Sequence, residues 1–215
     1  MDTKEISTAV IKRLPRYYRY LGDLLERGVM RISSMDLSEK MNITASQIRQ
    51  DLNNFGCFGQ QGYGYNVEML QNEIKRILGL DRTYKLIIIG VGNLGQALAE
   101  YDNFEKRGFK FVGLFDVSLG LIGKEIRGVK IQSMSELRGF LQENEIDIAV
   151  FSMPKSNAQE VLDIVLKAGI KGIWNFSHLD LKVNKYKGVK VENVHLTDSL
   201  MTLSYMLNED KLKDL

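Results

Sequence analysis

The stretch from Lys85 to Asp116 constrains the fold more than any other part of the sequence. Its apolar run Leu86–Ile89 predicts a buried strand, and the glycine-rich segment Gly90–Gly95 follows directly as G-x-G-x-x-G. That pattern is weak by itself, but here a predicted helix follows it and the next strand ends in Asp116. The three glycines permit a tight turn, close approach of a pyrophosphate and close packing of helix on strand. The segment therefore predicts a Rossmann unit that binds a dinucleotide.

Asp116 stands 21 residues after Gly95, where an acid that binds the ribose hydroxyls belongs. A carboxylate repels a 2′-phosphate, and no arginine follows in Asp116-Val117-Ser118. We therefore expect NAD(H) rather than NADP(H). A Rossmann-like sheet that holds another nucleotide, such as coenzyme A, or none, is the alternative.

The rest of the second half alternates strand and helix, which predicts a mostly parallel sheet with helices on both faces. The predicted strands are Leu86–Ile89, Phe111–Phe115, Ile146–Phe151 and Gly172–Phe176, with Lys190–Val194 as a further strand, and the helices are Leu94–Phe104, Ser135–Gln142 and Asn157–Ala168. An amphipathic helix at Ser199–Leu207 has no obvious place on this sheet, which suggests that it packs on a partner chain.

The first 79 residues predict helices followed by one short hairpin. Pro15 should kink or break the first helix, and Ser33 or Ser34 can cap the second. Thr44–Gln47 has the form of a capping box at the start of a third helix. Four glycines interleaved with aromatic residues at Gly56–Tyr65 predict a tight β-hairpin. Tyr17, Tyr18 and Tyr20 are interpreted as core packing.

The charge and the cysteine content exclude few classes of function. The net charge is +2, but residues 10–50 carry eight basic and four acidic groups, a balance of 8 − 4 = +4. That excess favours phosphate contact, or forms an ordinary solvated face. The single cysteine, Cys57, and the lack of an apolar signal core or an 18-residue apolar stretch favour a cytoplasmic protein.

Catalysis has little support in the sequence. Of the two histidines, His178 follows a predicted strand at the ligand edge of the sheet and could serve as an acid or base, although a structural histidine is the more common case. No histidine or cysteine spacing indicates a metal site. An NAD(H)-dependent oxidoreductase or a coenzyme-A-binding enzyme fragment stays as the alternative function. A third possible function is that of a constitutive DNA-binding protein, in which the bound nucleotide only stabilises the structure.

A helix-turn-helix with a glycine-rich hairpin, joined to a dinucleotide fold, resembles the Rex family of bacterial redox-sensing transcriptional repressors. The resemblance covers essentially the whole chain, in Arg13–Leu21, Ile32–Ser34, Ile48–Leu52, Phe55–Tyr65, Gly90–Gly95, Phe115-Asp116 and Gly169–Phe176. It implies an α/β protein with three parts: a winged helix-turn-helix domain at 1–79, a Rossmann NAD(H) domain at 80–196, and a domain-swapped C-terminal helix and tail at 197–215.

The resemblance also implies a homodimer that binds an inverted-repeat operator and is released when NADH replaces NAD⁺. The implied cofactor-binding residues are Gly90, Val91, Gly92, Asn93, Leu94, Gly95, Tyr101, Asp116, Val117, Ser152, Met153, Pro154, Asn175, Phe176 and Ser177. The implied DNA-binding residues are Arg13, Arg16, Ser33, Ser34, Thr44, Ser46, Gln47, Arg49, Gln50, Phe58, Gln61 and Gly62. The implied switch residues are Arg19, Tyr101, His195, Leu196 and Asp198.

The chain departs from the family pattern at two places. Gln60-Gln61 in the wing and Gln50 on the third helix stand where basic residues are common, which implies weaker attraction to phosphate and a shallower salt dependence. His195-Leu196 stands where the family has an Asp-Phe switch pair, and Asp198 is a candidate replacement. A contact of His195 with Tyr101 would make the response depend on pH.

Overall fold

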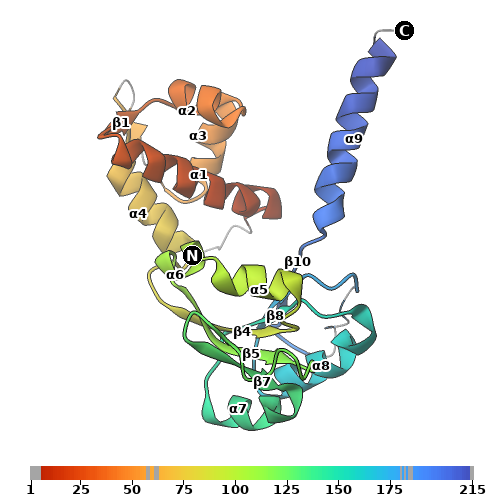
Figure 1. Cartoon of the computed structure of the whole chain (residues 1–215). Coiled ribbons are helices and arrows are strands. Elements are labelled where there is room, and N and C mark those ends of the chain that lie inside the picture. Colours follow the sequence, from red (N-terminus) through yellow and green to blue (C-terminus); the bar gives the residue numbers. More distant parts are fainter. Residues whose placement is uncertain are drawn as a thin grey trace. The chain divides into compact units, whose positions relative to one another are not determined.

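The computed structural model describes residues 6–56, 59–60, 63–179, 181, 183 and 186–213. The chain divides into two compact units, Met1–Arg82 and Thr83–Leu215 (Figure 1). The predicted boundaries after residues 79 and 196 stay predictions, and the C-terminal helix falls within the second unit. No helix in the described ranges is long and apolar enough to cross a bilayer.

The first unit is a winged helix. It contains helices α1 (Thr8–Glu26), α2 (Ser34–Met41), α3 (Ala45–Asn53) and α4 (Val67–Ile77), and the strands β1 (Arg31–Ile32), β2 (Gly59–Gln60) and β3 (Gly64–Asn66). The strands form an antiparallel sheet in the order β1-β3-β2. The hairpin β2–β3 was predicted, whereas the two-residue strand β1 is too short to leave a periodic signal.

The helix ends are set mostly by side chains that the sequence pointed to. Ser33 caps α2 and forms a reciprocal capping box with Asp36. Asn42 in the turn between α2 and α3 is left-handed, with a φ of 51°. The capping box at Thr44 is only half formed: Thr44 accepts from the Gln47 amide, but the Gln47 side chain bonds elsewhere.

Pro15 was predicted to kink or break the first helix. A break is wrong, because α1 is one helix from Thr8 to Glu26 with Pro15 inside it, and the kink stays a prediction. Proline removes one backbone donor, which leaves the carbonyl of Ile11 without its helical partner. Both Pro15 and Ile11 lie on the exposed side of α1, where water can satisfy that carbonyl. The buried side continues through Leu14, Tyr17 and Leu21, so packing holds the helix together.

The second unit is a seven-stranded sheet in the order β10-β9-β8-β4-β5-β7-β6, parallel except for β6 (Figure 1). Its strands are β4 (Tyr84–Ile89), β5 (Phe109–Asp116), β6 (Glu125–Ile126), β7 (Val129–Ser133), β8 (Ile148–Phe151), β9 (Gly172–Asn175) and β10 (Lys190–Asn193). Its helices are α5 (Asn93–Glu100), α6 (Asn103–Lys106), the 3-10 turn η1 (Met134–Glu136), α7 (Leu137–Glu143), α8 (Lys155–Lys167) and α9 (Leu196–Lys213). The prediction of a mostly parallel sheet is confirmed, but the hairpin β6–β7 was not foreseen.

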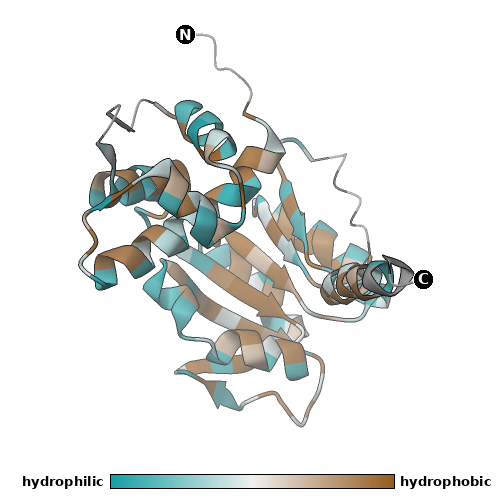
Figure 2. Cartoon of the chain, turned by 90° about the horizontal axis from the view of Figure 1, so that it is seen from above, coloured by the Kyte–Doolittle hydropathy of each residue, from teal (hydrophilic) through white to brown (hydrophobic). Residues whose placement is uncertain are grey.

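Alternate residues of β4 build two cores, one on each face of the sheet. Ile87 and Ile89 pack in the cluster that holds the buried side chains of α7 and α8. Leu86 and Ile88 pack in the cluster that holds Ala99 of α5. In Figure 2 the central strands are correspondingly apolar along their length. Because both faces are covered, the four residues Leu86–Ile89 of β4 are all apolar and buried, which is typical of a buried parallel strand.

Candidate functional site

The glycine-rich turn links β4 to α5 with little free space. Gly90 has a φ of 94°, and a Cβ atom there would lie 2.8 Å from the Met153 amide nitrogen. A Cβ at Gly95 would lie 2.2 Å from the Gly90 carbonyl oxygen, so any side chain would push α5 off the turn. A Cβ at Gly92 would meet nothing within 4 Å. Gly92 therefore faces open space, where a ligand can approach the backbone at the start of α5.

Asp116 ends β5 beside this turn and is nearly buried. Its carboxylate accepts hydrogen bonds from the amide of Val91 at 2.5 Å and from the amide of Ser118 at 2.8 Å. These bonds fix the carboxylate against the turn. Each oxygen keeps a lone pair that can accept from a ribose hydroxyl.

A cavity of about 510 Å³ lies at this edge of the sheet. It sits where the strand order reverses, outside the carboxyl ends of β4 and β8, which is the usual ligand position in open α/β sheets. Seven of the predicted cofactor residues line it: Gly90, Gly92, Asp116, Val117, Ser152, Met153 and Pro154. Ser152 Oγ also donates to the Gly90 carbonyl at 2.7 Å, which ties the loop after β8 to the turn.

The cavity has further walls that the sequence did not indicate. Met134 and Ser135 line it from the segment after β7, and Asn157 and Glu160 line it from α8. Met134 and Ser135 follow a strand that the sequence analysis did not assign, so their place at the carboxyl edge of the sheet had no signal. Asn157 lies in a predicted helix, but only the position of that helix brings it to the cavity.

The other predicted cofactor residues do not line this cavity. Asn175 is fully buried, and its amide donates to the carbonyl of Leu179 and to the side chain of Asn193, while its oxygen accepts from Ser177. Asn175 thus fastens the loop after β9, Phe176 packs on Trp174, and Ser177 is buried. Val91, Asn93, Leu94 and Gly95 form the turn and the start of α5.

Tyr101 ends α5 and is 51% exposed. Its ring contacts Phe104 edge-on, and it lines a separate cavity of about 220 Å³. His195, the predicted switch residue, stacks on His178 instead of Tyr101, with ring centroids 6.2 Å apart. Leu196 and Asp198 lie exposed in the first turn of α9, and Arg19 is exposed on α1 of the other unit.

The first unit presents the exposed side of a helix-turn-helix. Ser46, Arg49 and Gln50 of α3 are exposed, and Arg49 donates to Ser34 Oγ at 2.9 Å. Arg16 donates to the carbonyl of Met41, so it holds α1 against the end of α2. The predicted wing residues Phe58, Gln61 and Gly62 lie outside the described residues.

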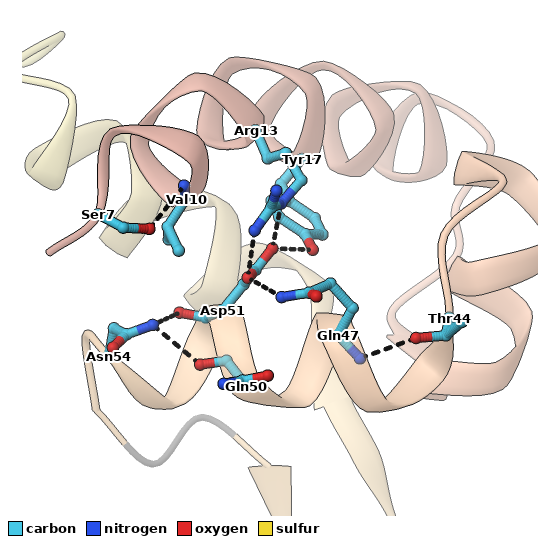
Figure 3. Close-up of polar contacts among 9 residues, drawn as sticks. All are labelled: Ser7, Val10, Arg13, Tyr17, Thr44, Gln47, Gln50, Asp51 and Asn54. Carbon is cyan, nitrogen blue, oxygen red and sulfur yellow. Dashed lines mark hydrogen bonds and ion pairs between the residues drawn. The ribbon is translucent and has the colours of Figure 1, made fainter.

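Asp51 of α3 is the centre of a buried polar network that the sequence analysis missed (Figure 3). Arg13 of α1 donates two hydrogen bonds to its carboxylate, from Nε at 2.6 Å and from Nη2 at 2.8 Å. The Tyr17 hydroxyl donates at 2.9 Å and Gln47 Nε2 at 2.7 Å. Arg13 and Gln47, both predicted to contact DNA, therefore hold Asp51. The only sign of this network in the sequence is that Gln47 and Asp51 are four residues apart on one helix, which makes their side chains neighbours.

The hydrogen-bond donors around Asp51 stabilise its charged carboxylate form. Burial by itself would raise the pKa of Asp51, but the hydrogen bonds from Arg13, Gln47 and Tyr17 outweigh it and lower the pKa below its ordinary value of 3.8. Burial and the hydrogen bond to Asp51 raise the pKa of Tyr17. Asp51 is therefore held as a carboxylate and Tyr17 as a neutral hydroxyl.

The described residues contain no group of three or more histidine, cysteine, aspartate or glutamate side chains that could hold a metal ion. Two family models match the chain. One, described as a putative DNA-binding protein N-terminus, matches residues 5–53, and the other, a CoA binding domain, matches residues 81–179.

The similar proteins cover nearly the whole chain. A redox-sensing transcriptional repressor Rex of Clostridioides difficile (strain 630) is 58% identical over 98% of this chain and 100% of its own length. One from Thermoanaerobacter pseudethanolicus is 59% identical over 97% of this chain and 92% of its own length. The chain belongs to the Rex family of redox-sensing transcriptional repressors.

Solved structures of a Rex-family repressor, RSP, agree with this assignment. RSP in complex with β-NAD⁺ and operator DNA has a TM-score of 0.89 and 58% identity, covering 97% of this chain and 95% of that one. RSP in complex with β-NADH has a TM-score of 0.89 and 55% identity, covering 98% of both chains. These Rex proteins are repressors, so the match to a CoA binding domain reflects the shared Rossmann architecture. The enzyme alternatives lose their support.

Proposed function

We propose that this chain, as a homodimer, binds an inverted-repeat operator through its winged helix and releases it when NADH replaces NAD⁺. The observation that carries the proposal is the open backbone at Gly92 beside the fixed carboxylate of Asp116, in one chain with a helix-turn-helix. A two-fold dimer is required because two recognition helices must enter successive major grooves. Because the proposed ligand is operator DNA, we propose that the protein acts in the cytoplasm.

The dinucleotide is proposed to lie along the 510 Å³ cavity with its pyrophosphate over Gly92 and its ribose at Asp116. Asp116 and Glu160 both line this cavity, so a 2′-phosphate would lie near acidic residues. That arrangement favours NAD(H) over NADP(H). NADH can shift the protein only through contacts that differ between the two conformations, and an apolar surrounding favours its uncharged ring over the charged ring of NAD⁺.

Dimerisation is proposed to use α9. Its apolar side chains Leu196, Leu200, Met201, Leu203, Tyr205, Met206 and Leu207 are 50–67% exposed. Exposed apolar side chains in this number on one helix are typical of an interface. The family's swapped helix occupies this part of the chain, so the proposed partner surface belongs to a second copy.

On the DNA side, Ser46, Arg49 and Gln50 are proposed to face the major groove, because their side chains are exposed on α3. Arg16 and the segment at Ser33 and Ser34 are proposed to contact phosphates at the edge of the groove. Thr44 caps α3 by accepting from the Gln47 amide, and the amides of Ala45 and Ser46 in the same turn are proposed to bind a phosphate.

A gel-shift on an AT-rich inverted-repeat duplex tests the proposal, with NAD⁺ and NADH titrated separately at fixed salt. Release by NADH alone supports redox sensing. Equal effects of both nucleotides, or none, contradict it and favour a constitutive DNA-binding protein. Steady turnover of NADH with small carbonyl compounds would restore the enzyme alternative.

An Asp116→Ala variant is the matched control. We expect it to keep DNA binding and lose the response to nucleotide, because Asp116 lies in the second unit. Asp116→Asn should weaken the nucleotide response while it preserves more of the hydrogen bonding to the turn. Loss of DNA binding in both variants would contradict the proposal that the first unit binds DNA and the second binds the nucleotide.

A further inference from the structure

The side chain of Arg31 reaches the turn of the wing from the neighbouring strand. Arg31 lies on β1, where it pairs with Asn66 of β3, and Nη1 of its guanidinium donates to the carbonyl of Tyr63 at 3.4 Å. Its Cζ atom lies 5.9 Å from the centroid of the Tyr63 ring. Tyr63 directly precedes β3, in the turn between β2 and β3. A basic group from outside the hairpin is therefore held at the hairpin turn.

Close packing of β3 on β1 keeps Arg31 and Tyr63 together. Gly64 has a φ of 69°, and a Cβ atom there would lie 2.6 Å from the carbonyl oxygen of Ile32. The two strands thus approach more closely at this point than a side chain would allow. Ile32 is buried and Arg31 is exposed, so the guanidinium lies on the solvent side of the small sheet.

The charge of Arg31 is open to an outside partner. Among the residues that the structure describes, no carboxylate forms an ion pair with it, whereas Arg13 is paired with Asp51. One of its five guanidinium N–H groups donates to Tyr63, which leaves four for other acceptors. Tyr63 is itself 70% exposed. The pair is therefore a cationic group on an exposed ring, with donors that suit an anion.

We propose that Arg31 binds a DNA phosphate beside the wing and that the Tyr63 ring positions its guanidinium. The inference rests on the DNA binding proposed above and adds a contact outside the recognition helix. Arg49 of α3 donates to Ser34, three residues after Arg31, so the segment 31–34 links the recognition helix to the wing turn. A guanidinium held on one side can meet two phosphate oxygens at once. Such contacts fix the register of a protein on the duplex without reading its sequence.

Arg31 also compensates for the glutamines of the wing. Gln60-Gln61 stands where basic residues are common in the family, and a wing without charge attracts phosphate weakly. Arg31 supplies positive charge to the same hairpin from β1. The wing therefore keeps a share of the salt dependence of DNA binding, which the two glutamines alone would remove.

The salt dependence of DNA binding tests the inference, using the full-length protein with NAD⁺ and labelled AT-rich inverted-repeat duplexes that have AT-rich or GC-rich flanks. Arg31→Gln removes one charge from each protomer. The slope of log affinity against log salt should become shallower by about two, since each phosphate contributes about 0.9. Affinity at low salt should fall at least about tenfold on both duplexes. Arg138→Gln, the same change at an exposed position of α7, is the matched control and should match wild type.

Variants at Tyr63 test the positioning role of its ring. Tyr63→Phe keeps the ring and the backbone carbonyl, so it should match wild type. Tyr63→Ala removes the ring and keeps the charge of Arg31, so the salt slope should persist while affinity falls about two- to fivefold per protomer. In the Arg31→Gln background, Tyr63→Ala should cause no further loss, because the ring acts through the guanidinium.

Three results overturn the inference while the wild type still binds the duplex: a wild-type salt slope in folded Arg31→Gln, a loss confined to the duplex with AT-rich flanks, or additive losses in the double variant. The second result would mean that Arg31 reads a narrow minor groove instead of a phosphate. Thermal melting reports whether each variant folds, and Arg31→Met, which keeps the length of the side chain, replaces Arg31→Gln if that variant does not. If the wild type binds no inverted repeat at all, the proposed function fails instead.

Discussion

The imidazole rings of His178 and His195 lie nearly parallel, with their centroids 6.2 Å apart and an angle of 14° between their planes. They are the only two histidines of the chain. His178 lies in the loop after β9, and His195 directly precedes α9. The contact therefore joins the ligand edge of the sheet to the start of the helix that we propose to form the dimer.

This contact predicts that the two histidines act together in the response to NADH. His178→Ala and His195→Ala should each reduce the difference between NADH and NAD⁺ in releasing DNA, and the double variant should be no worse than either single one. Fluorescence anisotropy of a labelled inverted-repeat duplex, titrated with each nucleotide, measures the effect. Additive losses would show that the stacked pair does not couple the loop to α9.

The glycine-rich turn predicts two different outcomes for the same substitution. Gly92→Ala should fold normally, because its Cβ meets nothing within 4 Å, but should bind NADH at least tenfold more weakly, because the methyl group occupies the pyrophosphate position. Gly95→Ala should lower stability by about 2 kcal/mol or more, because its Cβ lies 2.2 Å from the Gly90 carbonyl oxygen. Calorimetric titration and thermal melting separate the two effects. Normal NADH affinity in Gly92→Ala would refute this position for the cofactor.

The Asp51 network predicts a loss of stability in acid. A carboxyl whose pKa is lower in the folded than in the unfolded state stabilises the protein above its unfolded pKa, and this stabilisation is lost as the pH falls through the folded pKa. The free energy of unfolding of the wild type should therefore fall more steeply than that of Asp51→Asn from about pH 5 downwards. Urea denaturation at a series of pH values measures both slopes. Parallel curves would mean that Asp51 has the same pKa in both states.

Asn175 is expected to be a structural residue in this chain. Asn175→Ala removes an amide that makes four hydrogen bonds in the interior and leaves Ser177 and Asn193 without their partner. The expected loss is about 2–4 kcal/mol. Equilibrium unfolding measures it, with Gln142→Ala, at an exposed position of α7 away from the proposed cofactor cavity, as the control. A loss of NADH affinity with unchanged stability would instead indicate direct contact with the cofactor.

The exposed apolar side of α9 predicts that charges there separate the dimer. Leu200→Lys together with Leu203→Lys should shift the protein to monomers, since each buried leucine contributes about 1.5–3 kcal/mol. Gln142→Lys, at an exposed position of α7 outside this surface, should leave the dimer intact. Sedimentation velocity distinguishes the two. A dimer that survives the leucine substitutions would move the interface to another surface.

Residues that act through local geometry were predictable from the sequence. The glycine turn, the acid at Asp116 and the cap at Ser33 depend on backbone conformation and short spacing, which the chain specifies within a few residues. The alternation of apolar strands and helices along the sequence likewise predicted the parallel sheet. The break that Pro15 allowed does not occur, because packing of Leu14, Tyr17 and Leu21 holds the helix together across the proline.

The sequence by itself determined that a dinucleotide turn lies between β4 and α5, because three glycines and an acid at fixed spacing admit few other structures. Only the tertiary structure decided the partners of side chains distant along the chain. In the structure, Arg13 and Gln47 donate hydrogen bonds to Asp51, and the ring of His195 stacks on that of His178. The amide of Asn175 donates to the Leu179 carbonyl in its own loop. A buried polar group must be satisfied by whatever the packing brings near it, and no spacing in the sequence encodes that neighbour.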